Sequence, residues 1–101
     1  MSKEMKVVWG TPWIEVESGW GSRPEGWKLF LDRDEAVKDT HRASKDGPYE
    51  GGYIGPERPL KLYEIPFDSL PDVVQEKLRS SGKAFTSNYW DPKYKSAGSA
   101  I

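Results

Sequence analysis

The apolar residues of this chain recur mostly at every second position, which is the spacing of a β-strand. Between residues 13 and 17, Ile14 and Val16 alternate with Trp13, Glu15 and Glu17, the pattern of a half-buried strand. Similar short apolar runs predict further strands at 5–9, 27–31, 60–66 and 83–90. The Gly-Thr-Pro motif at 10–12 is predicted to separate the first two strands, and the glycines and proline of 18–26 are predicted to form a loop.

Two other segments have helical spacing. Asp32 precedes a predicted helix at 33–44, and its side chain can accept a hydrogen bond in the first turn, with Glu35 three residues later. Ser69 is predicted to cap a second helix, which ends where Gly82 can adopt a left-handed conformation. The apolar stripe of this second helix consists of Leu70, Val73, Val74 and Leu78.

The resulting order, β-β-β-α-β-α-β, predicts an α+β domain with a small, mostly antiparallel sheet and two helices packed on one face. We expect a single domain at 1–92 and a flexible C-terminal tail at 93–101, because that tail is rich in small polar residues. The expected core consists of apolar residues from both kinds of element: Val7, Ile14, Val16, Leu29, Leu31, Val37, Leu62, Ile65, Leu70, Val73, Val74, Leu78 and Phe85.

Composition excludes several classes of chemistry. The length of 101 residues suits one domain, and the absence of cysteine excludes disulfides, thiolate catalysis and cysteine-ligated metals. No apolar run approaches the roughly 20 residues that span a bilayer, and the first ten residues lack the apolar core of a secretory signal. We therefore predict a soluble, cytoplasmic protein that has no membrane partner.

The charge of the chain is nearly balanced but unevenly distributed. Fifteen basic and 16 acidic residues give a net charge of −1, which argues against extended duplex nucleic acid as a partner. From Lys77 onward five basic residues face one acidic residue, a net +4 that leaves −5 for residues 1–76. This basic segment could meet an acidic patch on a partner, but the favoured explanation is a solvated helix end and a basic tail.

Residues that suggest catalysis are few. His41 is the single histidine, and it has no second histidine or cysteine with which to form a site. The acidic cluster of Asp32, Asp34 and Glu35 is explained by the positive end of a helix dipole. The irregular stretch at 45–59 is glycine-rich but lacks the Gly-Lys-Ser/Thr ending of a phosphate-binding loop. We predict no cofactor and no metal.

Two glycine-rich segments combine arginine with aromatic residues, and both residue types are frequent at binding hot spots. The predicted binding residues are Trp20, Arg23 and Trp27 in the first segment and Tyr49, Tyr53 and Arg58 in the second. The alternative is that the second segment is a connector whose tyrosines pack back on the domain.

A third aromatic set is interleaved with lysines near the C-terminus: Tyr89, Trp90, Lys93, Tyr94 and Lys95. Such a set could stack bases, or it could be a strand end packed on the sheet.

Four stretches carry a general resemblance to known proteins. VVWGTPW and GWGSRPEGW make an aromatic, glycine-rich start, WKLFLDRDEAVK is a short strand that leads into a capped helix, and LPDVVQEKLRSSG is a compact helix. In these features the chain resembles small accessory proteins encoded by bacteriophages. The resemblance implies a stoichiometric binder, such as an inhibitor of a host enzyme or a sponge for a small signalling molecule, and it implies no particular residues.

The favoured hypothesis is a non-catalytic module that binds a protein and acts as an inhibitor or accessory factor. One alternative is a protein that binds or sequesters a small nucleotide-like anion with Arg23 and Arg58. A second alternative is a small enzyme that uses carboxylate, tyrosine and arginine side chains. We also expect a homo-oligomer that pairs through its tryptophan-bearing faces, because a small sheet leaves strand edges to cover.

Overall fold

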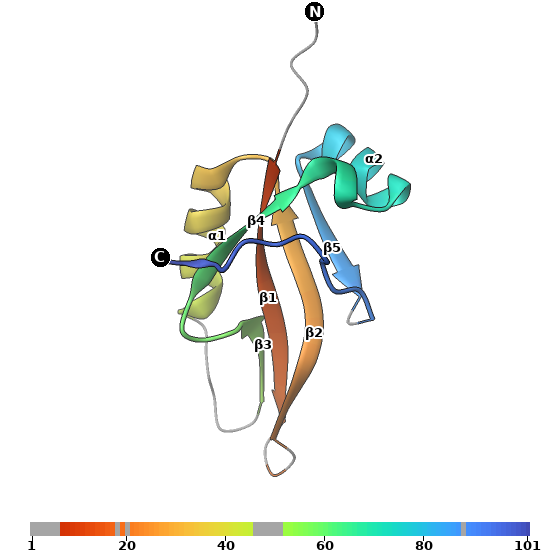
Figure 1. Ribbon diagram of the computed structural model, residues 1–101. Coiled ribbons are helices and arrows are strands. Elements are labelled where there is room, and N and C mark those ends of the chain that lie inside the picture. The colour runs from red at the N-terminus through yellow and green to blue at the C-terminus, as the bar shows by residue number, and fades with distance from the viewer. Residues whose placement is uncertain (1–6, 18, 20, 46–51, 88) are drawn as a thin grey trace, which may run out of the picture.

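A long antiparallel hairpin is the centre of the fold, and the other strands are added to it (Figure 1). The computed structural model describes residues 7–17, 19, 21–45, 52–87 and 89–101. The elements are β1 (Val7–Glu17), β2 (Gly21–Phe30), α1 (Arg33–Ser44), β3 (Tyr53–Pro56), β4 (Lys61–Pro66), a 3-10 turn (Phe67–Ser69), α2 (Asp72–Ser81), β5 (Lys83–Ser87) and β6 (Ser99–Ala100).

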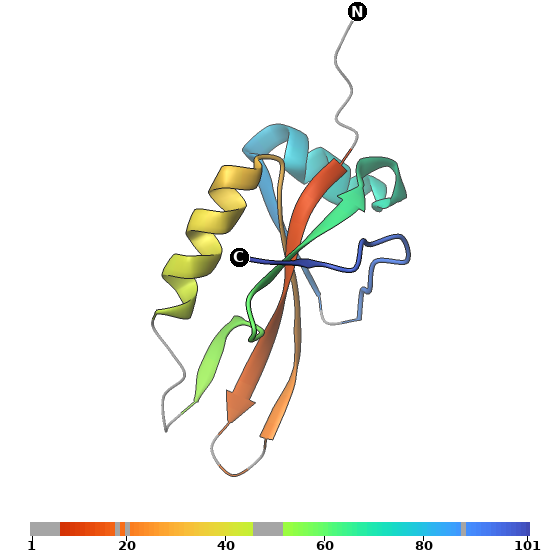
Figure 2. The ribbon, with the colours of Figure 1, turned by 60° about the vertical axis from the view of Figure 1, so that its left-hand side comes forward.

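The strands of the described chain form one sheet in the order β5-β2-β1-β4-β6. All five pairings between them are antiparallel, and β3 pairs with the second half of β1 while β4 pairs with its first half. β3 and β4 therefore occupy successive parts of the same edge of β1, and Figure 2 shows the chain running from β3 into β4, which crosses β1 in this view. The predicted α+β class with a small antiparallel sheet is confirmed.

β1 runs without a break through Pro12, where the sequence predicted a separation into two strands. The Pro12 carbonyl accepts a hydrogen bond from the Glu57 amide at 2.9 Å, so it points away from β2. The ring nitrogen of an extended residue points the same way as its carbonyl. On this side, β1 pairs with β4 as far as Gly10 and with β3 from Trp13 onward. Pro12 lies in the gap between these two partner strands. The missing N–H therefore costs no ladder bond.

The segment 18–26 was predicted to be a loop, and this is wrong because Gly21–Phe30 is strand β2. Trp13 pairs with Gly26 and Ile14 with Pro24, which leaves Glu25 as the extra residue of a β-bulge. Gly26 has φ 149°, and a Cβ there would lie 2.0 Å from the Thr86 carbonyl oxygen. The glycine thus permits close approach of β5, and the local turn signal is overridden by hairpin pairing.

The two helices cover opposite faces of the sheet, which corrects the prediction that both pack on one face. Val8 and Leu29 belong to a buried cluster that includes Leu78 of α2. Their strand neighbours Trp9 and Phe30 belong to a second cluster, which includes Ala36 and Val37 of α1. Successive residues of a strand point to opposite sides, so α2 and α1 lie on opposite faces.

The first helix has the predicted bounds, and Asp32 caps it by accepting a hydrogen bond from the Glu35 amide at 3.1 Å. The second helix begins at Asp72, later than predicted, and Ser69 does not cap it: its hydroxyl donates to the Pro66 carbonyl at the 3-10 turn. Gly82 ends α2 with φ 80°, as predicted.

The predicted core is partly correct. Leu29, Leu62, Ile65, Leu70 and Leu78 are buried. Val73 and Phe85, by contrast, are 75% and 48% exposed, so placing them in the core was wrong. The remaining members of the predicted core are only partly buried: Val7, Ile14, Val16, Leu31, Val37 and Val74. Buried residues outside the prediction include Val8, Trp27, Phe30 and Phe67.

The segment 93–101 was expected to be a flexible tail; its last six residues run along β4, and the segment crosses in front of the sheet in Figure 1. The Ser96 amide donates to the Glu64 carbonyl, and the Ser96 hydroxyl accepts from the Glu64 amide, both at 2.9 Å. Ser99 and Ala100 pair with β4. Ile101 packs on the cluster beside α1. The edge of β4 thus gives this polar segment a partner that its composition did not indicate.

No helix in the described part of the chain combines the length and the apolar character that a membrane crossing requires.

Candidate functional site

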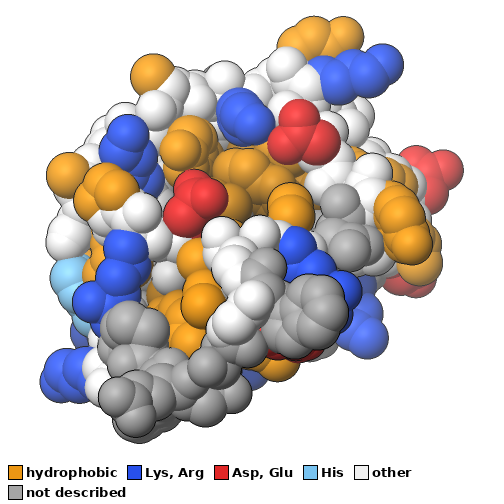
Figure 3. All heavy atoms as spheres, turned by 90° about the horizontal axis from the view of Figure 1, so that it is seen from below, with side chains coloured by type: hydrophobic (Ala, Val, Ile, Leu, Met, Phe, Trp, Pro, Cys, Tyr) orange, Lys and Arg blue, Asp and Glu red, His pale blue; other side chains and the backbone are white. Residues whose placement is uncertain are grey.

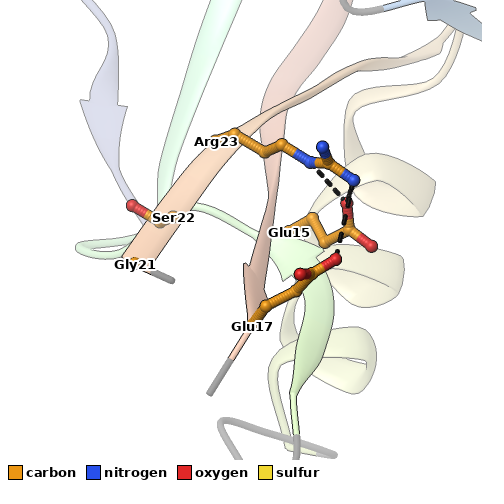
Figure 4. Close-up of a pocket in the computed structure, with 5 residues that line it drawn as sticks. All are labelled: Glu15, Glu17, Gly21, Ser22 and Arg23. Carbon is orange, nitrogen blue, oxygen red and sulfur yellow. Dashed lines mark hydrogen bonds and ion pairs between the residues drawn. The ribbon is translucent and has the colours of Figure 1, made fainter. Parts of the chain in front are cut away.

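Arg23 lies in β2 and is engaged by carboxylates of the neighbouring strand β1 (Figure 4). Its Nε lies 2.7 Å and its Nη2 2.5 Å from Oε1 of Glu15, and Nη2 lies 3.6 Å from Glu17. The hydrogen bond to Glu15, and then the charges of Glu15 and Glu17, raise the pKa of Arg23. The guanidinium is therefore directed at its own hairpin.

A hollow of about 200 Å³ lies at this pair, lined by Glu15, Glu17, Gly21, Ser22 and Arg23. Two carboxylates and one guanidinium leave it with a net negative charge. An anionic ligand would have to displace Glu15 from Arg23 and tolerate the second carboxylate. This arrangement does not favour the nucleotide-like anion that the sequence suggested for Arg23.

The other predicted binding residues have separate environments. Trp27 and Tyr53 are each 7% exposed, and the Tyr53 hydroxyl donates to the Pro56 carbonyl at 3.3 Å. Arg58 donates from Nη2 to the Ser44 carbonyl at the end of α1. Trp20 and Tyr49 lie outside the described residues. Arg23 is thus held within the β1–β2 hairpin, whereas Arg58 binds at the end of a helix.

A larger hollow of about 390 Å³ opens beside Trp27 on the α2 face of the sheet, and we call it the aromatic pocket. The described residues that line it are Pro12, Trp13, Ile14, Pro24, Gly26, Trp27, Glu57, Tyr63, Trp90, Asp91 and Lys95.

Three rings form the inner part of the aromatic pocket. Trp27 meets Tyr63 edge-to-face with centroids 5.2 Å apart, and it meets Trp90 edge-to-face at 6.5 Å. Both separations lie in the range of favourable aromatic pairs. The Lys95 ammonium lies 5.2 Å from the Trp27 ring centroid and 3.3 Å from Asp91 Oδ1. The Lys95 ammonium therefore already lies over the Trp27 ring.

Three separate segments position these rings. Trp27 is fixed in β2 by a hydrogen bond from its amide to the Thr86 hydroxyl at 3.2 Å. Tyr63 comes from β4, and a Cβ on Gly98 would lie 2.7 Å from the Tyr63 ring, so the C-terminal segment packs closely on it. Trp90 follows β5, and its amide donates to the Ser87 carbonyl at 3.1 Å. The ring arrangement depends on tertiary contacts.

Sequence reasoning singled out Trp27, Trp90 and Lys95, but in separate sets, and it missed Tyr63 as a site residue. One signal was available. Tyr63 alternates with Leu62 and lies two residues before Ile65, so strand periodicity alone places it on the Ile65 face.

A third hollow, of about 410 Å³, lies between α1 and the start of β5, and we call it the charged hollow. It is lined by Phe30, Glu35, Lys38, Asp39, Arg42, Ser81 and Lys83. Asp39 is engaged, since its Oδ2 lies 2.8 Å from Lys28 Nζ and its Oδ1 lies 3.9 Å from Arg42 Nη2. Cations outnumber carboxylates along its lining.

His41 is exposed on α1. Within the residues that the structure describes, no group of three or more histidine, aspartate or glutamate side chains is arranged to hold a metal ion. Seen from the end at which the β1–β2 hairpin turns, hydrophobic side chains show between lysine, arginine and acidic side chains (Figure 3). This end therefore presents a mixed apolar and charged surface.

No family model matches the chain, and it has no significant match among curated proteins or solved structures.

Proposed function

We propose that this chain is a non-catalytic binding module that holds a partner protein stoichiometrically, with the aromatic pocket receiving one side chain of the partner. The observation that carries the proposal is an open hollow of about 390 Å³ in which Tyr63 and Trp90 each meet Trp27 edge-to-face. Volumes of about 300–1,000 Å³ are usual for ligand sites. The module would act by occluding the surface that it covers.

The composition of the pocket wall supports this use. Tryptophan and tyrosine are enriched among the residues that dominate binding energy at interfaces, and such residues cluster in well-packed pockets. Trp27 is nine-tenths buried and hydrogen-bonded through its backbone, so little ordering is required of it when a partner binds. The exposed side chains of Glu57 and Asp91 lie among the pocket-lining residues and supply a polar rim.

A test uses an mRNA-displayed random peptide library selected on the immobilised protein. The wild type is expected to enrich a defined set of peptides. Trp90→Leu and Glu57→Lys should lose this enrichment, the first by removing a ring and the second by altering an exposed lining residue. Arg23→Ala is the matched control, because Arg23 lines a different hollow. Circular dichroism establishes that each variant folds.

Two outcomes contradict the proposal. In the first, the wild type enriches nothing above the background of Glu57→Lys. In the second, peptides are enriched equally by the wild type, Trp90→Leu and Glu57→Lys but not by Arg23→Ala, which would transfer the binding role to Arg23 and the residues around it.

A second candidate function is the binding of a small nucleotide-like anion in the charged hollow. The observation that favours it is the excess of cations there, with Lys38, Arg42 and Lys83 against Glu35 and Asp39. Calorimetric titration with AMP tests it: saturable binding by the wild type that is weakened in Lys83→Ala supports this function, and the absence of heat at millimolar AMP rejects it.

A further inference from the structure

We propose that the aromatic pocket is a site for a lysine-like ammonium group of a partner protein, and that Lys95 occupies it from within the chain as an internal competitor. This inference rests on the proposed function, since it names the kind of side chain that the pocket receives.

The first observation is the position of the Lys95 ammonium. It lies 5.2 Å from the Trp27 ring centroid, within the roughly 6 Å over which a cation is attracted to the electron-rich face of an aromatic ring. Tyr63 and Trp90 pack edge-to-face on the same ring. One ammonium group therefore already lies against the ring on which the other two aromatic side chains pack.

The second observation is the charge of the lining. Glu57 and Asp91 are carboxylates and Lys95 is the one cation among the described lining residues. Asp91 lies 3.3 Å from the Lys95 ammonium. If Lys95 leaves, the lining holds two carboxylates and no cation. An incoming ammonium restores the balance, whereas an anion would meet two like charges.

The third observation concerns the backbone that positions Lys95 and the exposure of its side chain. The next residue, Ser96, is bonded to Glu64 of β4 through both its amide and its hydroxyl, which fixes the backbone close to the pocket. The Lys95 side chain itself is 36% exposed, and its partner Asp91 is 75% exposed. Exposed ion pairs of this kind are weak, so the side chain can swing into solvent while the backbone stays in place.

An internal competitor weakens the affinity for an external ligand, and its removal should increase that affinity by the same factor. The usual strength of a cation–π contact corresponds to roughly 2- to 30-fold in an equilibrium constant. Lys95→Ala should therefore bind a free ammonium ligand roughly 2- to 30-fold more tightly than the wild type.

The probes are tetramethylammonium chloride and N-acetyl-lysine methylamide, with N-acetyl-norleucine methylamide as the neutral analogue of the latter. Titration is followed by the indole N–H resonances of Trp27 and Trp90, two residues that line the pocket. Lys93→Ala is the matched control, because it removes one positive charge from the same segment without removing a residue that lines the pocket. Glu57→Lys is the variant expected to lose binding.

Tighter binding of both cations by Lys95→Ala than by the wild type and Lys93→Ala, without a comparable response to the norleucine analogue, supports the inference. It is overturned if Lys95→Ala and the wild type bind equally, if the neutral analogue binds as well as the lysine analogue, or if neither cation gives saturable shifts. Pocket-dependent peptides that lack lysine in the display selection would also overturn it while leaving the proposed function intact. Cation binding without any enriched peptide would instead contradict the proposed function.

Discussion

At the scale of single residues, two adjacent valines of α2 show how position outweighs residue type. Val73 is 75% exposed, whereas Val74 packs against the cluster that contains Leu70 and Leu78. Successive residues of a helix point about 100° apart, so one valine can face solvent while its neighbour faces the sheet. The apolar stripe of the sequence included both and could not separate them.

Val74→Asp is expected to destabilise the fold by about 1–3 kcal/mol, because it places a carboxylate against an apolar cluster. Val73→Asp is the matched control. It introduces the same side chain in the same first turn, exposed to water, and should change the free energy of unfolding by less than about 0.5 kcal/mol. Urea unfolding of both variants measures this, and equal destabilisation would show that the two valines have similar environments.

Arg23 is the second residue whose surroundings decide its role. Its ion pairs with Glu15 and Glu17 are solvent-exposed, since the Arg23 side chain is 67% exposed. Arg23→Ala should therefore lower the Tm only slightly, and the difference from wild type should shrink as salt is raised to about 1 M, where charges are screened within about 3 Å. Thermal melts at low and high salt measure it. A large loss of Tm that persists at high salt would indicate a packing role.

At the scale of elements, α1 is a helix whose start is set by one side chain. The helix has few large apolar residues, and Ala36, Thr40 and Ser44 are its buried positions. The Asp32 carboxylate satisfies the Glu35 amide, which otherwise has no partner within the helix. Because these buried side chains are small, the capping hydrogen bond of Asp32 is expected to contribute measurably to the stability of α1.

Asp32→Ala should reduce the free energy of unfolding by about 1 kcal/mol, the usual loss when a capping side chain is removed. Asp32→Asn keeps an oxygen acceptor at the same place and should retain most of the stability. Chemical denaturation of the two variants makes the comparison. If the alanine variant matches the asparagine variant, the hydrogen bond to Glu35 does not stabilise α1.

At the scale of the whole molecule, the C-terminal segment completes the sheet and the aromatic pocket together. Ser96, Ser99 and Ala100 pair with β4, and Ile101 packs beside α1. The segment therefore covers the outer edge of β4, which would otherwise present unpaired backbone groups. It also carries Lys95 to Trp27.

Deletion of residues 96–101 is expected to lower the Tm by roughly 4 °C or more, which corresponds to about 1 kcal/mol in a domain of this size. The small polar composition of the segment, taken alone, predicts almost no change. Differential scanning calorimetry decides between the two, with Ile101→Ala as a smaller perturbation that should lose only the side-chain contact. An unchanged melting curve after deletion would show that the pairing with β4 adds no stability.

Self-association is a further property of the whole molecule that we expect. The four tryptophans that the structure describes pack within the fold, because Trp27 is buried and Trp9, Trp13 and Trp90 are partly buried. One candidate interface is the outer edge of β5, the strand at one end of the sheet, where Phe85 is 48% exposed. Pairing of two such edges would satisfy the unpaired backbone groups of both edge strands.

Light scattering over a concentration series is expected to show a dimer that weakens in Phe85→Lys. Circular dichroism of the variant confirms that it folds. A monomer mass at every concentration of the wild type rejects self-association.

Elements that local interactions stabilise could be predicted from the amino-acid sequence. The start of α1 follows from the Asp32 cap, the end of α2 follows from the left-handed Gly82, and β4 follows from an alternating run. These signals act over a few residues, so a single chain segment contains them.

Features that require partners distant in sequence arise only when the chain has folded. Pro12 is tolerated in β1 because β4 stops pairing with β1 at Gly10 and β3 starts at Trp13, and the C-terminal segment is positioned by its pairing with β4. The aromatic pocket depends in the same way on Trp27, Tyr63 and Trp90 being brought together by β2, β4 and the turn after β5. Intrinsic β-strand propensity contributes less to stability than backbone pairing and burial do. The pairing partners lie up to about sixty residues apart in the sequence, so no local sequence pattern identifies them.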